Sequence, residues 1–200
     1  MPEAQRSKEQ QLGELAEQIV ASNVAPELAA GAKSLVMGEG DADADIIFIG
    51  EAPGAKEDEL GRPFVGAAGK FLDEMLASIE LDRSAVYISN IVKYRPPGNR
   101  DPRPEEIEAF KPYLKQQIEI IQPNLIVFLG RHSMNVFLPE LRISEAHGRA
   151  FKRDGNVYMP LYHPAAALYN GGMRKTLLED FAGIPRLLKK IDQEKSLNLN

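Results

Sequence analysis

The side chains best suited to chemistry lie in three loops, each of which follows an apolar run. Glu51 lies in the loop GEAPG (50–54), Asn90 ends a second run, and His163 follows a third. A carboxylate at a strand end can act as a base when burial raises its pKa. An amide offers a donor and an acceptor that suit a pyrimidine edge, and a histidine can stabilise a developing anion. Each residue also has a purely structural alternative: the loop of Glu51 could be a polar turn, Asn90 could cap the end of a strand, and His163 could be a structural histidine.

Two further segments are suited to stacking and to charge. Phe64 lies in a Gly/Pro-rich loop (GRPFVG, 61–66), where an aromatic ring can stack on a planar ligand or plug the core from below. The stretch 93–103 (KYRPPGNRDPR) holds four basic residues against one acidic residue, namely Lys93, Arg95, Arg100 and Arg103. Its prolines stiffen it, which favours a loop that grips phosphates over a merely solvated loop.

Apolar periodicity predicts the elements that must position these loops. Short apolar runs indicate buried strands, and helical spacing indicates helices. The strands are expected at 45–50, 86–92, 125–130 and 157–161, and the helices at 8–22, 68–79, 104–121, 133–138 and 174–192. Pro160 places the last strand near an edge. This alternation predicts an α/β fold, a three-layer α/β/α arrangement around a central, largely parallel four-stranded sheet. Because ligands bind beyond the carboxyl ends of such strands, the three loops are expected to meet.

Composition limits the class of protein. The 200 residues include 44% hydrophobic and 26% charged residues, which is typical of a globular protein. This length predicts one domain over 1–200. Within it we expect an N-terminal helix in 1–25 and a flexible tail at 191–200. The absence of cysteine excludes disulfides and thiolate metal sites, and three scattered histidines predict no metal site. No apolar run is long enough to span a membrane. We expect a cytoplasmic monomer whose net charge of −5 still permits a local basic face.

Together and in this order, the motifs resemble the uracil-DNA glycosylase superfamily, and within it family 4. The resemblance is carried by GEGDADADIIFIGEAPGAKEDELGRPFVGAAGKFLD (38–73), YISNIVKYRPPGNRDPRPEEI (87–107), PNLIVFLG (123–130) and YHPAAAL (162–168). It runs from about residue 28 to residue 188. The combination of GEAPG, GRPFVG and KxRPPGNR is highly specific.

The resemblance implies a monofunctional DNA-repair hydrolase for base excision repair, which flips uracil out of single- or double-stranded DNA and cleaves its N-glycosidic bond. Phe64 would stack on the uracil, Asn90 would bond its Watson–Crick edge, and His163 would stabilise the uracil anion. Glu51 would position or deprotonate the attacking water. The remaining uracil-pocket residues would be Gly50, Ala52 and Gly54. DNA would contact Gly66, Lys93, Arg95, Arg100, Ala166, Ala167, Leu168 (a candidate wedge), Arg174 and Lys175.

One departure from the family concerns its [4Fe–4S] cluster, which four cysteines hold. Two come from an N-terminal C-x-x-C, one occupies the place of Tyr94, and the last lies around Ala109–Phe110. Here residues 21–26 read ASNVAP, and the chain has no cysteine. We therefore expect no cofactor, with Tyr94 and Phe110 filling the vacated volume. Because the residues of the chemistry are retained, we expect activity to survive.

Two other classes of function compete with this interpretation. The first is a non-catalytic module on the same fold that binds damaged or single-stranded DNA, which the joint retention of Glu51, Asn90 and His163 disfavours. The second is a flavodoxin-like nucleotide-binding protein, which lacks support because no phosphate loop is present and the acidic run 57–59 would repel phosphates. His132 and His147 are interpreted as structural histidines.

Overall fold

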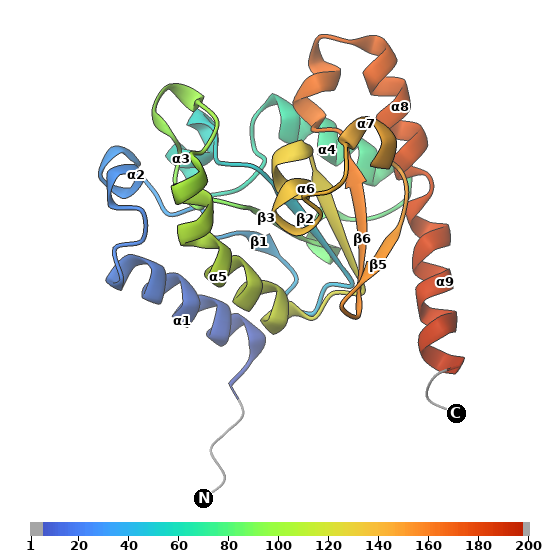
Figure 1. Cartoon of the computed structure of the whole chain (residues 1–200), viewed down its shortest axis with the longest axis horizontal. Helices are drawn as coiled ribbons and strands as arrows, with labels where there is room; N and C mark the ends of the chain where they lie inside the picture. The colour runs from blue at the N-terminus through green and yellow to red at the C-terminus, as the bar shows by residue number, and fades with distance from the viewer. Residues whose placement is uncertain (1–5, 198–200) are drawn as a thin grey trace, which may run out of the picture.

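Four parallel strands form the centre of the structure, a computed structural model that describes residues 6–197. They are β2 (Ile46–Gly50), β3 (Tyr87–Asn90), β4 (Leu125–Leu129) and β6 (Asn156–Leu161), arranged β3-β2-β4-β6 (Figure 1). Every residue of β2, β3 and β4 is buried, as expected for strands covered on both faces. The predicted α/β class and the predicted parallel strands are confirmed.

The sheet has six strands, so the predicted number of four is wrong. β1 (Glu39–Gly40) adds antiparallel to β3, and β5 (Phe151–Arg153) adds antiparallel to β6. Strands of two and three residues are too short to leave a periodic signal in the sequence. Pro160 lies in β6, one strand in from the edge, opposite Phe128 of β4.

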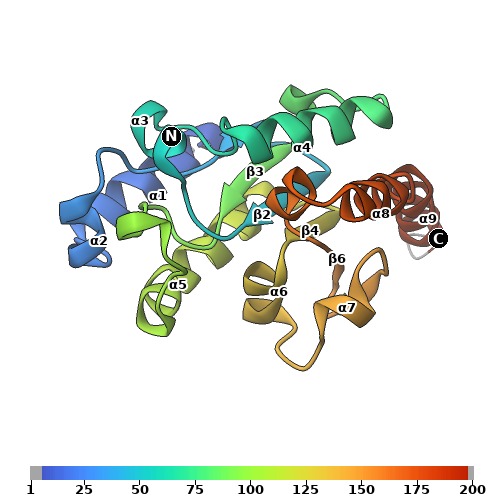
Figure 2. The same cartoon turned by 90° about the horizontal axis from the view of Figure 1, so that it is seen from above.

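Helices cover both faces of the sheet (Figure 2). One face packs against α4 (Ala67–Ser78), α8 (Gly171–Phe181) and α9 (Ile184–Leu197). The other packs against α1 (Lys8–Ala21), α5 (Pro104–Ile121), α6 (Arg131–Phe137) and α7 (Ile143–Ala146). The short α2 (Pro26–Gly31) and α3 (Ala55–Leu60) lie beside this core, with single 3₁₀ turns at Arg83–Ala85 (η1), Pro97–Asn99 (η2) and Pro164–Leu168 (η3). This arrangement agrees with the three predicted layers.

The ends of the chain differ in part from expectation. Residues 191–197, where the sequence predicts a flexible tail, form the last turns of α9, with Ile191 buried. Residues 1–5 and 198–200, on which the predicted N-terminal and C-terminal segments also fall, lie outside the described residues. Within 6–197, no helix combines the length and apolar character needed to cross a membrane.

Candidate active site

A cavity of about 370 Å³ opens where the central strands end. The loop after β2 supplies Glu51, the end of β3 supplies Asn90, and the residue before η3 supplies His163. Phe64 completes the set from the loop between α3 and α4. The full lining consists of Glu51, Ala52, Pro53, Gly54, Glu57, Phe64, Ala68, Asn90, Pro96, Asn99, Arg100, Asp101, His163 and Ala165. The structure thus brings together the four side chains that the sequence singles out.

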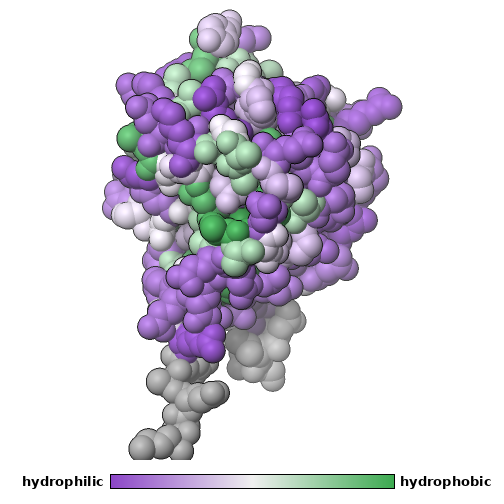
Figure 3. Space-filling view, turned by 90° about the vertical axis from the view of Figure 1, so that its left-hand side faces the viewer, coloured by the Kyte–Doolittle hydropathy of each residue, from purple (hydrophilic) through white to green (hydrophobic). Residues whose placement is uncertain are grey.

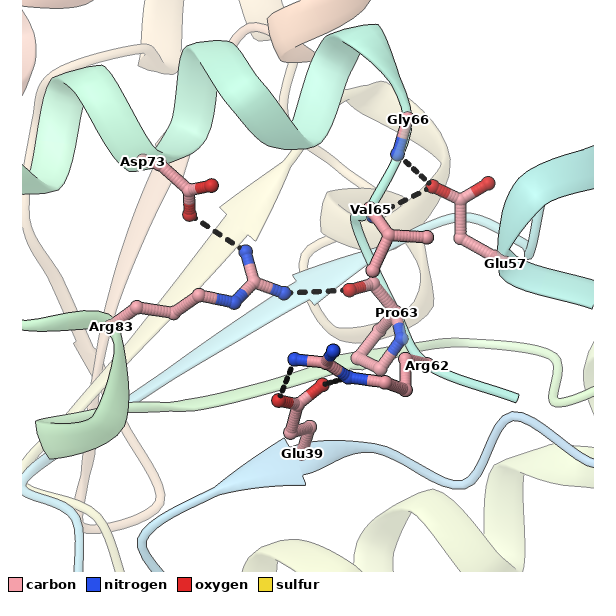
Figure 4. A network of polar contacts seen from close by, with 8 residues as sticks. All are labelled: Glu39, Glu57, Arg62, Pro63, Val65, Gly66, Asp73 and Arg83. Carbon is pink, nitrogen blue, oxygen red and sulfur yellow. Dashed lines mark hydrogen bonds and ion pairs between the residues drawn. The ribbon is translucent and has the colours of Figure 1, made fainter. Parts of the chain in front are cut away.

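The loop that carries Phe64 is fixed by side chains from three separate elements (Figure 4). Glu39 of β1 accepts two hydrogen bonds from Arg62 of this loop, at 2.6 and 2.8 Å. Glu57 of α3 accepts hydrogen bonds from the backbone N–H groups of Val65 and Gly66, at 2.9 and 2.8 Å. Arg83 donates to the carbonyl of Pro63 at 2.6 Å. Phe64 itself adopts a left-handed backbone, with φ at 50°. Such a conformation is costly for an aromatic residue and persists only where its surroundings enforce it, as they do here.

Gly50 lets Phe64 and Asn90 lie close together. A Cβ at position 50 would stand 2.4 Å from Asn90 Oδ1 and 2.6 Å from the Phe64 ring, so any side chain there would displace both. Asn90 is only 1% exposed, and its Oδ1 is buried without a hydrogen-bond partner. A buried unpaired acceptor costs about 1–3 kcal/mol. The cavity therefore contains a buried acceptor that a ligand donor can satisfy.

Lys93 does not reach the surface, which contradicts the prediction that it grips a phosphate. Its side chain is fully buried, and Nζ donates to Ser89 Oγ at 2.6 Å, Gln117 Oε1 at 2.7 Å and the Asn90 carbonyl at 2.9 Å. Burial lowers the pKa of Lys93 to about 7. Lys93 thus stabilises the position of Asn90 through the hydrogen bond to its carbonyl.

His163 is arranged as a neutral donor. Its Nδ1 accepts the Ala165 N–H at 3.1 Å, which assigns the hydrogen of the neutral ring to Nε2. Burial, reinforced by the nearby His132, lowers the pKa of His163 to about 4, so the imidazole is uncharged at neutral pH. The ring lies 5.8 Å from the Phe64 ring, between centroids. A fixed neutral donor therefore lies beside the aromatic wall of the cavity.

Glu51 lies beside Asp101, His132 and Arg131, none of which the sequence interpretation assigned to the site. Burial raises the pKa of Glu51, and Asp101 acts in the same direction, whereas His132 and Arg131 oppose them. His132 Nε2 lies 3.3 Å from Asp101 Oδ2 and 4.0 Å from Glu51 Oε2. His132 lies three residues after the end of β4, in the first turn of α6, so the strand-end rule that identified Glu51 applied to it as well. One ligand atom from each of Glu51, Asp101 and His132 lies within 4.8 Å of the others, a set of groups that could also hold a metal ion.

The remaining residues predicted to contact DNA occupy two regions. Arg95 donates to Asn99 at 2.8 Å, and Arg100 forms a two-bond ion pair with Glu106, at 2.6 and 2.9 Å. Both flank the cavity, where Asn99 and Arg100 form part of the lining. In η3, Ala167 is buried, whereas Ala166 and Leu168 are exposed.

The two basic residues of α8 lie outside the cavity lining. Arg174 is paired with Glu74 and lies over the Phe71 ring, 4.3 Å from its centroid. Lys175 is exposed and 3.7 Å from Glu179. Gly66 lies at the start of α4, where its N–H is already used by Glu57.

The positions that correspond to the family's cluster cysteines meet in one apolar cluster. Val24, Tyr94 and Phe110 are buried there together, and the Tyr94 and Phe110 rings meet edge to face with centroids 5.9 Å apart. None of these side chains is a thiolate, so the residues present do not fit an iron–sulfur cluster. Figure 3 shows the side of the molecule that lies at the left in Figure 1, where an apolar patch is bordered by hydrophilic residues. A hollow of about 300 Å³ is lined by Ala25, Pro26, Leu28 and Ala109 together with charged side chains.

Comparison with known proteins places the chain in a family. Residues 37–182 match the sequence model of the uracil DNA glycosylase superfamily. A type-4 uracil-DNA glycosylase of Sulfurisphaera tokodaii is 49% identical over 162 residues, which is 76% of this chain and 74% of that protein. A type-4 uracil-DNA glycosylase of Archaeoglobus fulgidus is 49% identical over 164 residues, 78% of this chain and 82% of that protein. A type-5 uracil-DNA glycosylase of Pyrobaculum aerophilum is 29% identical over 151 residues, 66% of each chain. Because the match spans most of the chain and includes the loops that form the cavity, this protein belongs to the uracil-DNA glycosylase superfamily.

Proposed function

We propose that this protein hydrolyses the N-glycosidic bond of uracil in DNA and leaves free uracil and an abasic site. The observation that carries the proposal is the buried, unpartnered Oδ1 of Asn90 in a cavity walled by Phe64. Uracil presents an N–H donor at N3 beside the O4 acceptor, whereas cytosine presents an acceptor at N3. An acceptor held at this point therefore favours uracil, since cytosine would leave it unpaired. Stacking on Phe64 helps to offset the few kcal/mol that base flipping costs.

The chemistry needs two groups with different protonation states. As the C1′–N1 bond breaks, its electron pair moves onto the uracil ring, and the N–H at His163 Nε2 stabilises the charge that develops at O2. A neutral donor suits this role, which agrees with the lowered pKa of His163. Water then attacks C1′, and the carboxylate of Glu51 accepts the proton that this water loses. The raised pKa of Glu51 makes it a stronger base than an exposed glutamate.

The experiment that tests this function is uracil release from single-stranded and duplex oligonucleotides that contain one uracil. Stoichiometric free uracil and alkali-labile abasic sites are expected. Binding of the same oligonucleotides without release would instead identify a non-catalytic damage-binding module. Matched oligonucleotides with thymine or cytosine at the same position provide the control for base choice.

DNA is proposed to bind across the cavity, with η3 on one side and the loop 94–103 on the other. Ala167 anchors η3 in the core, and the exposed Leu168 is the proposed wedge, in the same turn as Ala165, which lines the cavity. Arg95 and Arg100 supply positive charge next to it. Arg174 and Lys175 are proposed as more distant phosphate contacts, although Arg174 must first leave Glu74.

Replacing Arg95 by alanine is expected to weaken DNA binding for all sequences alike and to reduce the salt slope by about one unit. The reason is that a phosphate contact carries charge but no base identity, so uracil preference should not change. Affinity measured by fluorescence anisotropy over a range of salt concentrations gives the slope. Arg153→Ala, which removes an arginine paired with Glu140 near the β5 edge, is the control and should match the wild-type protein. A wild-type slope for Arg95→Ala would place the loop away from DNA.

We also propose that the protein acts without an iron–sulfur cluster, because it has no cysteine to ligate one. Purified protein should contain no stoichiometric iron and should show no absorbance band in the visible region. Iron analysis and an absorbance scan on protein prepared without oxygen provide the check. A stoichiometric cluster in such a preparation would contradict the proposal.

A further inference from the structure

Two exposed hydrophobic side chains follow one another at the end of the turn that borders the cavity. Among residues 6–197, Tyr169 is the most exposed large hydrophobic residue, at 95%, and the preceding Leu168 is exposed as well. Within that range, Tyr169 also makes no hydrogen bond or ring contact. Single apolar side chains on a surface are ordinary, whereas a contiguous pair beside a cavity points to an interaction. Leu168 has a proposed role as the wedge, and Tyr169 has none.

The backbone that carries Tyr169 is held on both sides. Before it, η3 is anchored by the buried Ala167 and by the N–H of Ala166, which donates to the carbonyl of His163 at 2.9 Å. After it, the side chain of Asn170 caps α8 by accepting a backbone N–H of the first helical turn, at 3.1 Å. The ring is therefore exposed on an ordered backbone, and binding through it does not require the chain to become ordered first.

Tyr169 ends the same short turn that His163 begins. His163 immediately precedes η3, Tyr169 immediately follows it, and Ala165 between them lines the cavity. The segment that joins β6 to α8 projects at the top of Figure 1, at the end of the sheet toward which β6 points. In the chain, Tyr169 thus lies between the residue that faces the base and the basic residues of α8, Arg174 and Lys175.

We propose that the ring of Tyr169 stacks on the face of a nucleobase beside the flipped nucleotide. The inference rests on the proposed function, because that function brings DNA to this turn. When a nucleotide leaves the helix, the bases around it lose a stacking partner, and an exposed aromatic ring can replace that partner. Every base has such a face, so this contact adds affinity without base preference. The stacked base can belong to the uracil strand or to the opposite strand.

The test measures binding to oligonucleotides that contain 2′-fluoro-2′-deoxyuridine, whose glycosidic bond resists cleavage. Tyr169→Ala is expected to bind about 5- to 150-fold more weakly than the wild-type protein, the range for loss of one stacked base. Tyr169→Phe keeps the ring without the hydroxyl and is expected to bind as the wild-type protein does. Leu197→Ala, which removes an exposed apolar side chain at the end of α9, is the control and should not change the affinity.

Single-stranded and duplex forms of the same oligonucleotide identify the strand that supplies the base. Weaker binding of both forms by Tyr169→Ala assigns the stacked base to the uracil strand, and weaker binding of the duplex alone assigns it to the opposite strand. 2-Aminopurine placed at the assigned position then reports the contact directly, because stacking quenches its fluorescence. Its emission in complexes with the wild-type protein and Tyr169→Phe should be lower than in the complex with Tyr169→Ala.

Two results would overturn the role of Tyr169. One is wild-type affinity of Tyr169→Ala for both forms of DNA. The other is an equal loss for Tyr169→Ala and Tyr169→Phe, which would assign the effect to the hydroxyl group instead of the ring. A wild-type protein that binds these oligonucleotides but releases no uracil from deoxyuridine substrates would overturn the proposed hydrolysis alone, and one that binds neither form would overturn both proposals.

Discussion

The Asn90→Ala protein is expected to fold normally and to release uracil on the order of 1,000-fold more slowly than the wild-type protein. The substitution removes the acceptor that pairs with the uracil N3–H, and the ligand donor would then be buried without a partner. That loss is about 4 kcal/mol of transition-state stabilisation. Single-turnover release with saturating enzyme measures it, because under these conditions slow product dissociation does not mask the chemical step.

The melting temperature separates this effect from misfolding. In the free protein Asn90 Oδ1 has no partner, so its removal forfeits no hydrogen bond at that atom. The variant should therefore melt near the wild-type temperature. Asn156→Ala, which changes an asparagine in the hairpin between β5 and β6, is the matched control and should release uracil at the wild-type rate. Near-wild-type release by a folded Asn90→Ala protein would remove Asn90 from the recognition of uracil.

The Phe110→Ala protein is expected to lose about 3–5 kcal/mol of unfolding free energy. The ring is fully buried and packs edge to face on Tyr94, so truncation leaves a cavity in the apolar cluster beneath α2 and α5. A loss of this size corresponds to a fall of about 10 °C in melting temperature for a chain of this length. Calorimetry and urea unfolding both report it.

Tyr169→Ala is the control for loss of an aromatic ring, because Tyr169 is 95% exposed and its truncation should not change the melting temperature. Uracil release by Phe110→Ala should be close to the wild-type rate at low temperature and should fall as unfolding begins. An unchanged melting temperature would show that this cluster does not stabilise the fold, and that the loop 94–103 depends on other contacts.

The central elements were predictable because each has a strong local signal. β2 and β4 are short all-apolar runs, and α5 begins at Pro104, as predicted from the proline and the acidic residues that follow it. Once the strands are parallel, their carboxyl ends share one edge, which is why Glu51, Asn90 and His163 could be placed together before the structure was known. β1 and β5 were missed because pairing with a neighbouring strand, rather than their own residues, defines them.

The burial of Lys93 and the neighbours of His132 could not be predicted from the sequence. Lys93 was assigned to the surface because lysine is rarely buried, yet three oxygen acceptors, on the nearby Ser89 and Asn90 and on the distant Gln117, compensate for its burial. His132 was taken as structural because a lone histidine in a sequence says nothing of its neighbours, and its contact with Asp101 joins residues about 30 positions apart. In each case at least one partner is remote in sequence, Gln117 for Lys93 and Asp101 for His132, and no local pattern encodes such a contact.

The two short edge strands have a consequence for the molecule at high concentration. A long, open edge offers unpaired N–H and C=O groups on which a strand of another molecule can add. Here β1 presents only two residues and β5 only three, and the exposed side chains of Lys152 and Arg153 lie on β5. A second copy therefore finds too few consecutive backbone groups for stable intermolecular pairing, and it would also have to accommodate the ion pairs that Lys152 and Arg153 form with Glu194 and Glu140. The short edge strands thereby shield the parallel centre of the sheet from edge-to-edge self-association.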